Sequence, residues 1–316
     1  LLILPALRRA VLALAPWAAA PALAAALFAD GTLRAPMLLL DLRLGLDATS
    51  RLFLLFTALL WLAAGTAALR YHAGDARRLR LWVAWLLTMA GNLWLVLALD
   101  AAGFYAGFAL MTFAGYALVV HAGSDEAWRA GRIYLVMSLF GEVLLLAGLL
   151  QRVGAIGNTA LPLPPLGGPH EALAAVLLFA GFGVKAGVAG LHMWLPLAHP
   201  VAPTPASAVL SGAMIKAGVL GWMRFLPIGF EPWPLLGGTA VALGLLAAFG
   251  AVAVGLTQRA PKTLLAYSSI SQMGFLTVGV GAALLAPWAS GPLLAAVTLY
   301  ALHHGLAKGD GADSGD

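Results

Sequence analysis

The 316-residue sequence contains no cysteine and has few charged residues. A chain without cysteine forms no disulfides, and it offers no thiolate ligands for a metal ion or an iron–sulfur cluster. Charged residues make up only 10% of the sequence, while 62% of residues are hydrophobic. Soluble domains are about 45 to 50% apolar, so this composition excludes a soluble domain, a disordered chain and an ordinary nucleic-acid-binding protein. The chain is predicted to lie in a lipid bilayer.

Common nucleotide and metal motifs are absent as well. No GxxxxGK[ST] phosphate loop, GxSxG elbow or HExxH metal motif occurs, and His170 and Glu171 are followed by Ala-Leu-Ala. We therefore expect no bound cofactor or metal and no catalytic chemistry on this chain. Whether it forms part of an enzyme depends on its partners.

Long apolar runs are what the sequence has instead. Most are close to the ~20 residues that an α-helix needs to cross the hydrocarbon core of a bilayer, and none shows the alternation of a transmembrane β-strand. The predicted fold is an all-α, polytopic transmembrane bundle of about ten helices. The segments are residues 10–29, 52–69, 81–99, 103–121, 133–151, 171–195, 207–228, 235–257, 263–285 and 293–308.

Basic residues between these segments predict the orientation of the chain. Alternate loops place ten basic residues on one side and five on the other, so the positive-inside rule predicts a cytoplasmic amino terminus in the inner (plasma) membrane. Arg8 and Arg9 before an apolar run also resemble a secretory signal, but nine further apolar segments argue against that alternative. The larger group is Arg8, Arg9, Arg70, Arg77, Arg78, Arg80, Arg129, Arg132, Arg259 and Lys262, and the smaller is Arg34, Arg43, Arg51, Arg152 and Arg224.

Lysine is rare, and its positions are unusual. Only four of the 18 basic residues are lysines, and three of them, Lys185, Lys216 and Lys308, lie inside apolar segments. Glu142 is central in its own segment. A charge at the bilayer centre costs about 2.5 to 3.5 kcal/mol on insertion scales, so each of these residues needs a compensating polar environment.

Lysine at these positions favours proton transfer. A buried lysine can release its proton, whereas arginine is effectively always protonated. His192 follows Lys185 by seven residues, two helical turns, so we expect it on a similar face, where it can carry protons between the lysine and water. The alternative is that the buried charges form ion pairs that only hold helices together, with His192 at the membrane interface.

Four prolines, Pro196, Pro200, Pro203 and Pro205, follow the segment that contains Lys185. Proline removes a backbone donor and interrupts helices. We expect a proline-broken helix near residues 190–205, of the kind that exposes backbone ends to ions in transporters. A proline-rich loop between two intact helices is the alternative.

Two stretches resemble a known family. AGFGVKAGVAGLHMWLPLAHPVAPTPASAVLSGAMIKAGVLGWMRF and, further on, PKTLLAYSSISQMGF are similar to the proton-translocating, antiporter-like subunits of complex I, membrane-bound hydrogenases and multisubunit cation/proton antiporters. The resemblance implies two inverted repeats of five helices, each with a broken helix and a central lysine. Lys185 then matches the lysine of the first broken helix, and Lys216 and Lys308 match further lysines along a polar axis. His192 falls beside the break.

The sequence departs from the family pattern at three points. The family carries a glutamate at the position of Ala109, so we hypothesise that Glu142, one helix later, supplies the carboxylate. Compared with the family pattern, we expect that the family's first helix is missing, and residues 309–316 form a polar tail where a second broken helix is expected. We expect a truncated chain, with residues 1–308 as one transmembrane domain holding the first repeat and the start of the second.

The predicted function is proton translocation through Glu142, Lys185, His192, Lys216 and Lys308 in a complex I-like NADH-quinone oxidoreductase or a membrane-bound hydrogenase. Its partners would be the lipid bilayer and other membrane subunits. Protons, with Na+ as a second candidate, would be the transported ions, and no nucleic acid is involved. The alternatives are a subunit of a multisubunit Na+/H+ (Mrp-type) antiporter and a non-conducting structural subunit.

Overall fold

The amino-terminal apolar segments form helices whose ends follow local sequence signals. The computed structural model describes residues 12–309. Pro16 lies at the start of a 3-10 turn, and Asp47 and Ser50 cap the next long helix reciprocally, each side chain accepting a hydrogen bond from the other's backbone amide. Asp100 caps a later helix through the Gly103 amide, at 2.6 Å. The elements are η1 (Ala15–Ala19), α2 (Ala20–Phe28), α3 (Ala48–Tyr71), α4 (Arg78–Leu97) and α5 (Ala101–Val119).

A short antiparallel ribbon connects α2 to α3. Its strands are β1 (Thr32–Ala35) and β2 (Leu42–Gly45), and Arg34 lies directly opposite Arg43. Like charges in this position repel each other, but Asp41 accepts hydrogen bonds from both guanidinium groups, at 2.6 and 2.7 Å. The hydrogen bonds from Arg34 and then Arg43 lower the pKa of Asp41 to about 2. The carboxylate therefore stays charged and holds the ribbon closed.

The middle of the chain contains the longest helix and the broken one. Ser124 caps α6 (Asp125–Ile156), acidic residues occupy its first turn, and Gly157 ends it in the left-handed conformation. The next helix ends at Ala186, before the end of the predicted segment 171–195, and two short helices and a π-helical turn follow it. These elements are α7 (Gly168–Ala186), α8 (Leu195–Val201), α9 (Thr204–Val209), η2 (Leu210–Met214) and α10 (Lys216–Phe225).

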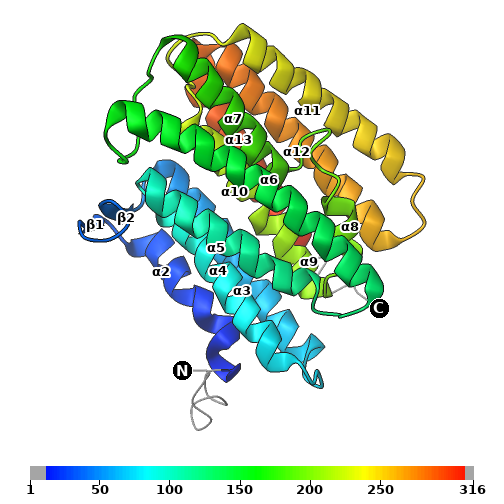
Figure 1. Ribbon diagram of the computed structural model, residues 1–316. Coiled ribbons are helices and arrows are strands. Elements are labelled where there is room, and N and C mark those ends of the chain that lie inside the picture. Colours follow the sequence, from blue (N-terminus) through cyan, green and yellow to red (C-terminus); the bar gives the residue numbers. More distant parts are fainter. Residues whose placement is uncertain (1–11, 310–316) are drawn as a thin grey trace.

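The remaining helices complete the bundle. They are α11 (Pro234–Gly255), α12 (Pro261–Leu285), the 3-10 turn η3 (Pro287–Ala289) and α13 (Ser290–Gly309). In Figure 1, α2 to α5 lie on one side and α11 and α12 on the other, with α6 to α10 between them, while α13 packs against both α12 and α3. Residues 195–225, from α8 to α10, therefore lie within the bundle and are largely buried.

The predicted fold class is confirmed. Each of the ten apolar segments contains helix, although residues 187–194 of the segment 171–195 are not helical and residues 10 and 11 lie outside the described residues. Seven helices of residues 12–309 are long and apolar enough to cross a membrane. One of them is the continuous stretch Thr204–Phe225, which contains α9, η2 and α10. The chain is a multi-pass helical membrane protein.

The break in the helix begins earlier than the proline pattern indicates. The backbone leaves the helix at Gly187, whose φ of +79° lies in the left-handed region that favours glycine, and it is not helical again until Leu195. Pro196 lies in the first turn of α8, where a missing amide donor costs little. Gly187 thus ends α7, the first part of the broken helix, and Pro196 lies in the first turn of α8, where the helix resumes.

Candidate functional site

Lys185 lies in the last turn of α7, immediately before the break. Its side chain is only 3% exposed. Helix α10 packs closely here, because a Cβ on Gly218 would come within 2.6 Å of the Phe182 carbonyl oxygen. The helix end and the close contact together hold the lysine inside the protein, away from lipid.

Aromatic side chains surround the Lys185 amine. Its Nζ lies 5.3 Å from the ring centre of Tyr134 and 5.7 Å from those of Phe108 and Trp194. It also donates a hydrogen bond of 3.4 Å to the Tyr134 hydroxyl, which in turn donates to the Thr112 carbonyl at 2.9 Å. Aromatic faces attract a cation without carrying charge, so this environment stabilises the protonated amine without neutralising it.

Glu142 on α6 lines the same small cavity as Lys185, together with Thr112, Ser138 and Trp194. The cavity has a volume of about 10 Å³, roughly the space that one water molecule requires. Glu142 is 3% exposed, and neither of its oxygens has a hydrogen-bond partner among the described residues. An unpartnered buried carboxylate is costly unless a proton or a nearby cation compensates its charge.

Lys216 is the first residue of α10 and follows the π-helical turn η2. The Ile215 amide donates to the Leu210 carbonyl five residues back, where an α-helix would use Ser211. The Ser211 carbonyl accepts a hydrogen bond from the Lys216 amine instead. Lys216 is 1% exposed. Single π-helical turns inside helices are frequent at functional sites, and here the turn supplies the lysine with its acceptor.

Two buried histidines and Lys308 lie near Lys216. Helix α13, which carries His304 and Lys308, packs against α9 and against η2, the turn that precedes Lys216. His199 bonds to the Ser207 hydroxyl at 2.6 Å, while neither ring nitrogen of His304 has a partner among the described residues. His303, its neighbour in sequence, is exposed. The Lys308 amine donates to the Leu265 carbonyl and to the Ser268 hydroxyl, both at 3.3 Å.

The predicted site residues therefore form two groups. Glu142 and Lys185 share one cavity, and Lys216 and Lys308 lie together with His199 and His304. Among the described residues no hydrogen bond joins Lys185 to Lys216. The two histidines were not among the predicted site residues, because helical periodicity alone does not show that residues of α8 and α13 approach the same lysine.

The expected position of His192 is wrong. The prediction required a continuous helix from Lys185 to His192, but residues 187–194 are not helical. His192 is half-buried in this turn, its Nδ1 has no partner among the described residues, and it does not line the cavity of Glu142 and Lys185. It lies within the break itself, and among the described residues no hydrogen bond joins it to the lysine amine.

A buried ion pair was also missed. Arg152, expected in a loop between two apolar segments, is 1% exposed and lies 3.0 Å from a carboxylate oxygen of Glu171. The guanidinium also donates to the carbonyls of Phe225 and Pro164, at 2.7 and 2.8 Å. This pair fastens the end of α6 to the start of α7 and the end of α10. The sequence signal was present, since both residues border apolar segments, but neither has its partner nearby in sequence.

The fold and these buried charges define a class of protein: a multi-pass helical bundle with a broken helix and ionisable groups inside. Residues 98–308 match the model of the family described as "NADH:quinone oxidoreductase/Mrp antiporter, TM". The chain belongs to this family, and the resemblance seen in the sequence is confirmed.

Individual relatives come from several kinds of complex. Hydrogenase-4 component B of Escherichia coli is 28% identical over 284 residues, which cover 85% of this chain and 42% of that protein. NADH-quinone oxidoreductase subunit N of Heliobacterium modesticaldum is 34% identical over 191 residues, 57% of this chain and 40% of that one. F(420)H(2) dehydrogenase subunit N of Methanosarcina mazei is 30% identical over 276 residues, 84% and 54%. The chain thus spans about half or less of the length of these relatives.

Solved structures share the fold. A chain of the Mrp complex from Dietzia sp. DQ12-45-1b superimposes with a TM-score of 0.81 at 23% identity, over 95% of this chain and 57% of that one. A chain of the membrane-bound sulfane sulfur reductase, an archaeal respiratory membrane complex, gives 0.76 at 21% identity, over 95% and 62%.

Proposed function

We propose that the chain is a proton-translocating membrane subunit of a complex I-like NADH-quinone oxidoreductase or a membrane-bound hydrogenase. The observation that carries the proposal is the buried cavity that Glu142 and Lys185 share. Membership of the family supports it, as do the relatives named as subunits of hydrogenase-4, NADH-quinone oxidoreductase and F(420)H(2) dehydrogenase. The proposal includes the proton-transfer roles of Glu142, Lys185, Lys216 and Lys308.

Glu142 would control the charge of Lys185. While Glu142 is ionised, its negative charge compensates the protonated amine across the cavity. When Glu142 takes up a proton, the amine keeps only the Tyr134 hydroxyl and the aromatic faces, and a poorly compensated cation in a low-dielectric interior is costly. Lys185 then releases its proton. Protonation of one residue thereby drives deprotonation of the other, which is the switch that a pump requires.

The released proton would pass to the group around Lys216. Because Lys185 and Lys216 are not joined by a hydrogen bond, water must carry the proton between them. The group that would receive the proton offers four side chains with nitrogen atoms: Lys216, His199, His304 and Lys308. His192, within the break, would serve as a polar contact for entering water.

The partners and orientation are part of the same proposal. Redox subunits of the complex would drive the conformational changes, and this chain would itself bind no NADH, flavin or metal needed for electron transfer. The protein would lie in the inner (plasma) membrane with a cytoplasmic amino terminus. Arg8 and Arg9, which enter that orientation, lie outside the described residues.

The direct test replaces Lys185 in the intact complex. The complex carrying Lys185→Ala is purified, reconstituted into vesicles, and compared with wild type for assembly, electron transfer and proton uptake. We expect normal assembly and lost proton movement. The exposed Arg259 offers a control, since Arg259→Gln should leave proton uptake unchanged. Full proton movement in Lys185→Ala would refute the proposed path.

Two alternatives lead to different outcomes. An Mrp-type Na+/H+ antiporter subunit, which the family description also includes, would exchange sodium for protons without an electron donor. If the chain is a non-conducting structural subunit, Lys185→Ala should weaken assembly or stability of the complex, while the complexes that do assemble should still move protons. Sodium-dependent dissipation of an imposed pH gradient, measured in the same vesicles, separates the first alternative from redox-driven translocation.

A further inference from the structure

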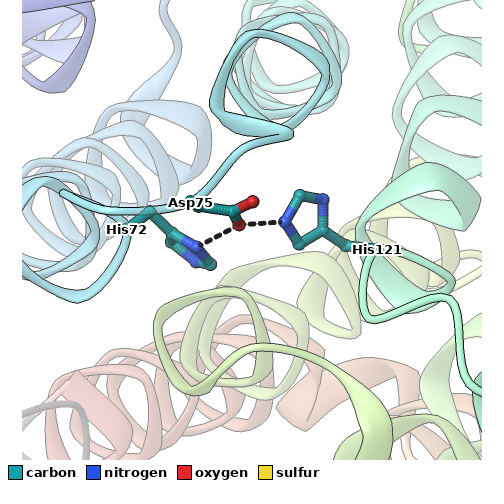
Figure 2. Close-up of side chains that lie close together, drawn as sticks. All are labelled: His72, Asp75 and His121. Atoms are coloured by element: carbon teal, nitrogen blue, oxygen red, sulfur yellow. Dashed lines mark hydrogen bonds and ion pairs between the residues drawn. The ribbon is translucent and has the colours of Figure 1, made fainter.

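Two buried histidines point toward a single carboxylate at one end of the bundle. His72 Nδ1 lies 3.0 Å and His121 Nε2 lies 2.6 Å from the same oxygen, Oδ2 of Asp75. Figure 2 shows the two imidazole rings reaching this carboxylate from opposite sides. His72 ends α3, Asp75 lies in the loop before α4, and His121 follows α5. None of the three lines the cavity of Glu142 and Lys185.

The surrounding backbone holds this cluster in place. The Arg77 amide donates to the other carboxylate oxygen of Asp75 at 2.7 Å, and the Arg77 guanidinium donates to the Ala122 carbonyl at 2.9 Å. Ala122 is the residue after His121, so Arg77 fastens the Asp75 loop to the turn that carries the second histidine. The cluster is thus built by two separate connections between helices and is already organised.

The three side chains are of the types that bind metal ions. His72 and His121 each offer an imidazole nitrogen, and Asp75 offers a carboxylate oxygen. His72 and His121 are 5% and 3% exposed. The Nδ1 of His121 is buried without a hydrogen-bond partner among the described residues. Neutral imidazole and carboxylate are both ligand forms.

The ligand atoms also lie close enough together for one ion. All three lie within 4.8 Å of one another. Two imidazole nitrogens and one carboxylate oxygen, with a fourth position left to water, form a known tetrahedral zinc set, with bonds of about 2.0 to 2.2 Å. Without thiolates, the set suits zinc better than softer ions such as Cu(I).

We propose that His72, Asp75 and His121 bind a zinc ion that joins the α3–α4 loop to the α5–α6 turn. The ion would replace the hydrogen bonds that join His72 and His121 to Asp75, while the Arg77 amide would keep its hydrogen bond to the other carboxylate oxygen. Each imidazole would move its proton to its other ring nitrogen, so that His72 Nδ1 and His121 Nε2 present lone pairs and no net proton is released. The site lies at the end where Arg70, Arg77, Arg78 and Arg80 cluster, the predicted cytoplasmic side, and it is separate from the proposed proton path.

The test compares zinc binding by the intact complex and by complexes with single substitutions in this chain. Each complex is incubated with a molar excess of zinc sulfate, desalted, and its zinc content is measured by mass spectrometry. We expect one more equivalent in wild type than in His121→Gln or Asp75→Asn, and affinity at least about tenfold weaker in both variants. His170→Gln, a change at an exposed histidine, should keep the full equivalent.

A thermal measurement keeps the test informative if a variant is unstable. Zinc should raise the unfolding temperature of wild type and His170→Gln but not that of Asp75→Asn. Equal zinc content in wild type and His121→Gln would overturn the proposal. So would a wild-type unfolding temperature that zinc leaves unchanged, because the cluster would then be only a hydrogen-bonded bridge. These outcomes do not depend on whether the chain translocates protons.

Discussion

Glu142 on α6 and Lys185 on α7 line one buried cavity without forming an ion pair. The ion pairs within 4.0 Å in residues 12–309 involve other residues. A tight pair would hold both charges fixed, since breaking a buried pair leaves an uncompensated charge at a cost of about 3 to 5 kcal/mol. Two charges separated by a cavity the size of one water molecule interact but can still change protonation state.

Replacing Glu142 by glutamine should abolish proton movement while the complex still assembles. Glutamine keeps the size of the side chain but carries no charge that could govern Lys185. The measurement is proton uptake by vesicles, with electron transfer recorded in parallel. Wild-type uptake in Glu142→Gln would show that this carboxylate has no role.

Moving the carboxylate tests whether Glu142 stands in for the family glutamate. Ala109 lies on α5 one turn from Thr112, which lines the cavity. If the two positions are interchangeable, Ala109→Glu should restore part of the proton uptake of Glu142→Ala. Ala109→Gln in the same background serves as the control and should restore none. If Ala109→Glu also restores no proton uptake, Glu142 does not stand in for the family glutamate.

Changing Lys185 to arginine should separate charge from proton release. Arginine keeps the positive charge but does not release a proton, so transport should be lost even where assembly is retained. The larger side chain will also strain a cavity of about 10 Å³, at a cost of roughly 1 to 3 kcal/mol of stability. Thermal unfolding should accompany the transport assay. Transport equal to wild type would mean that Lys185 supplies charge alone.

Arg152 should contribute strongly to stability. Arg152→Met leaves Glu171 buried without its partner, and the expected loss is about 3 to 5 kcal/mol in the free energy of unfolding. The double variant Arg152→Met/Glu171→Met should recover much of this loss, because no unpaired charge remains. Unfolding of the purified protein in detergent measures both effects. A double variant as unstable as the single one would show that the ion pair is not the cause.

Asp47 should make stability depend on pH in the acid range. It caps α3 and lies 3.0 Å from Arg224. Partial burial would by itself raise the pKa of Asp47, but Arg224 and the Ser50 hydrogen bonds outweigh this effect and hold the pKa below its usual value. Its stabilisation is therefore fully present above the usual aspartate pKa of about 3.9 and disappears as the pH falls through the lower folded value.

The matched variant for that effect is Asp47→Asn. Asparagine still caps a helix, so the variant loses only the charge, worth up to about 1 kcal/mol for a partly exposed pair. Its unfolding temperature should be lower than wild type at neutral pH and should converge with it in acid. Parallel curves at all pH values would contradict the assigned role.

Several features could be read from the sequence because they depend on local physics. Apolar runs of about 20 residues form helices wherever the solvent is lipid, so the positions of nearly all helices follow from composition. The high cost of burying a charge singled out Glu142, Lys185, Lys216 and Lys308 without any knowledge of the fold. Four lysines are few enough that the location of each carries information.

Tertiary structure decided what those charges contact. The break at Gly187 places His192 off the helical face of Lys185, and the π-helical turn before Lys216 frees the Ser211 carbonyl for its amine. Residues far apart in sequence meet as Arg152 with Glu171, and as His121 with Asp75. The helical periodicity and the hydropathy of the sequence determine which residues are removed from water. Which of them become neighbours depends on how helices pack, and that is set by contacts between residues distant in the chain.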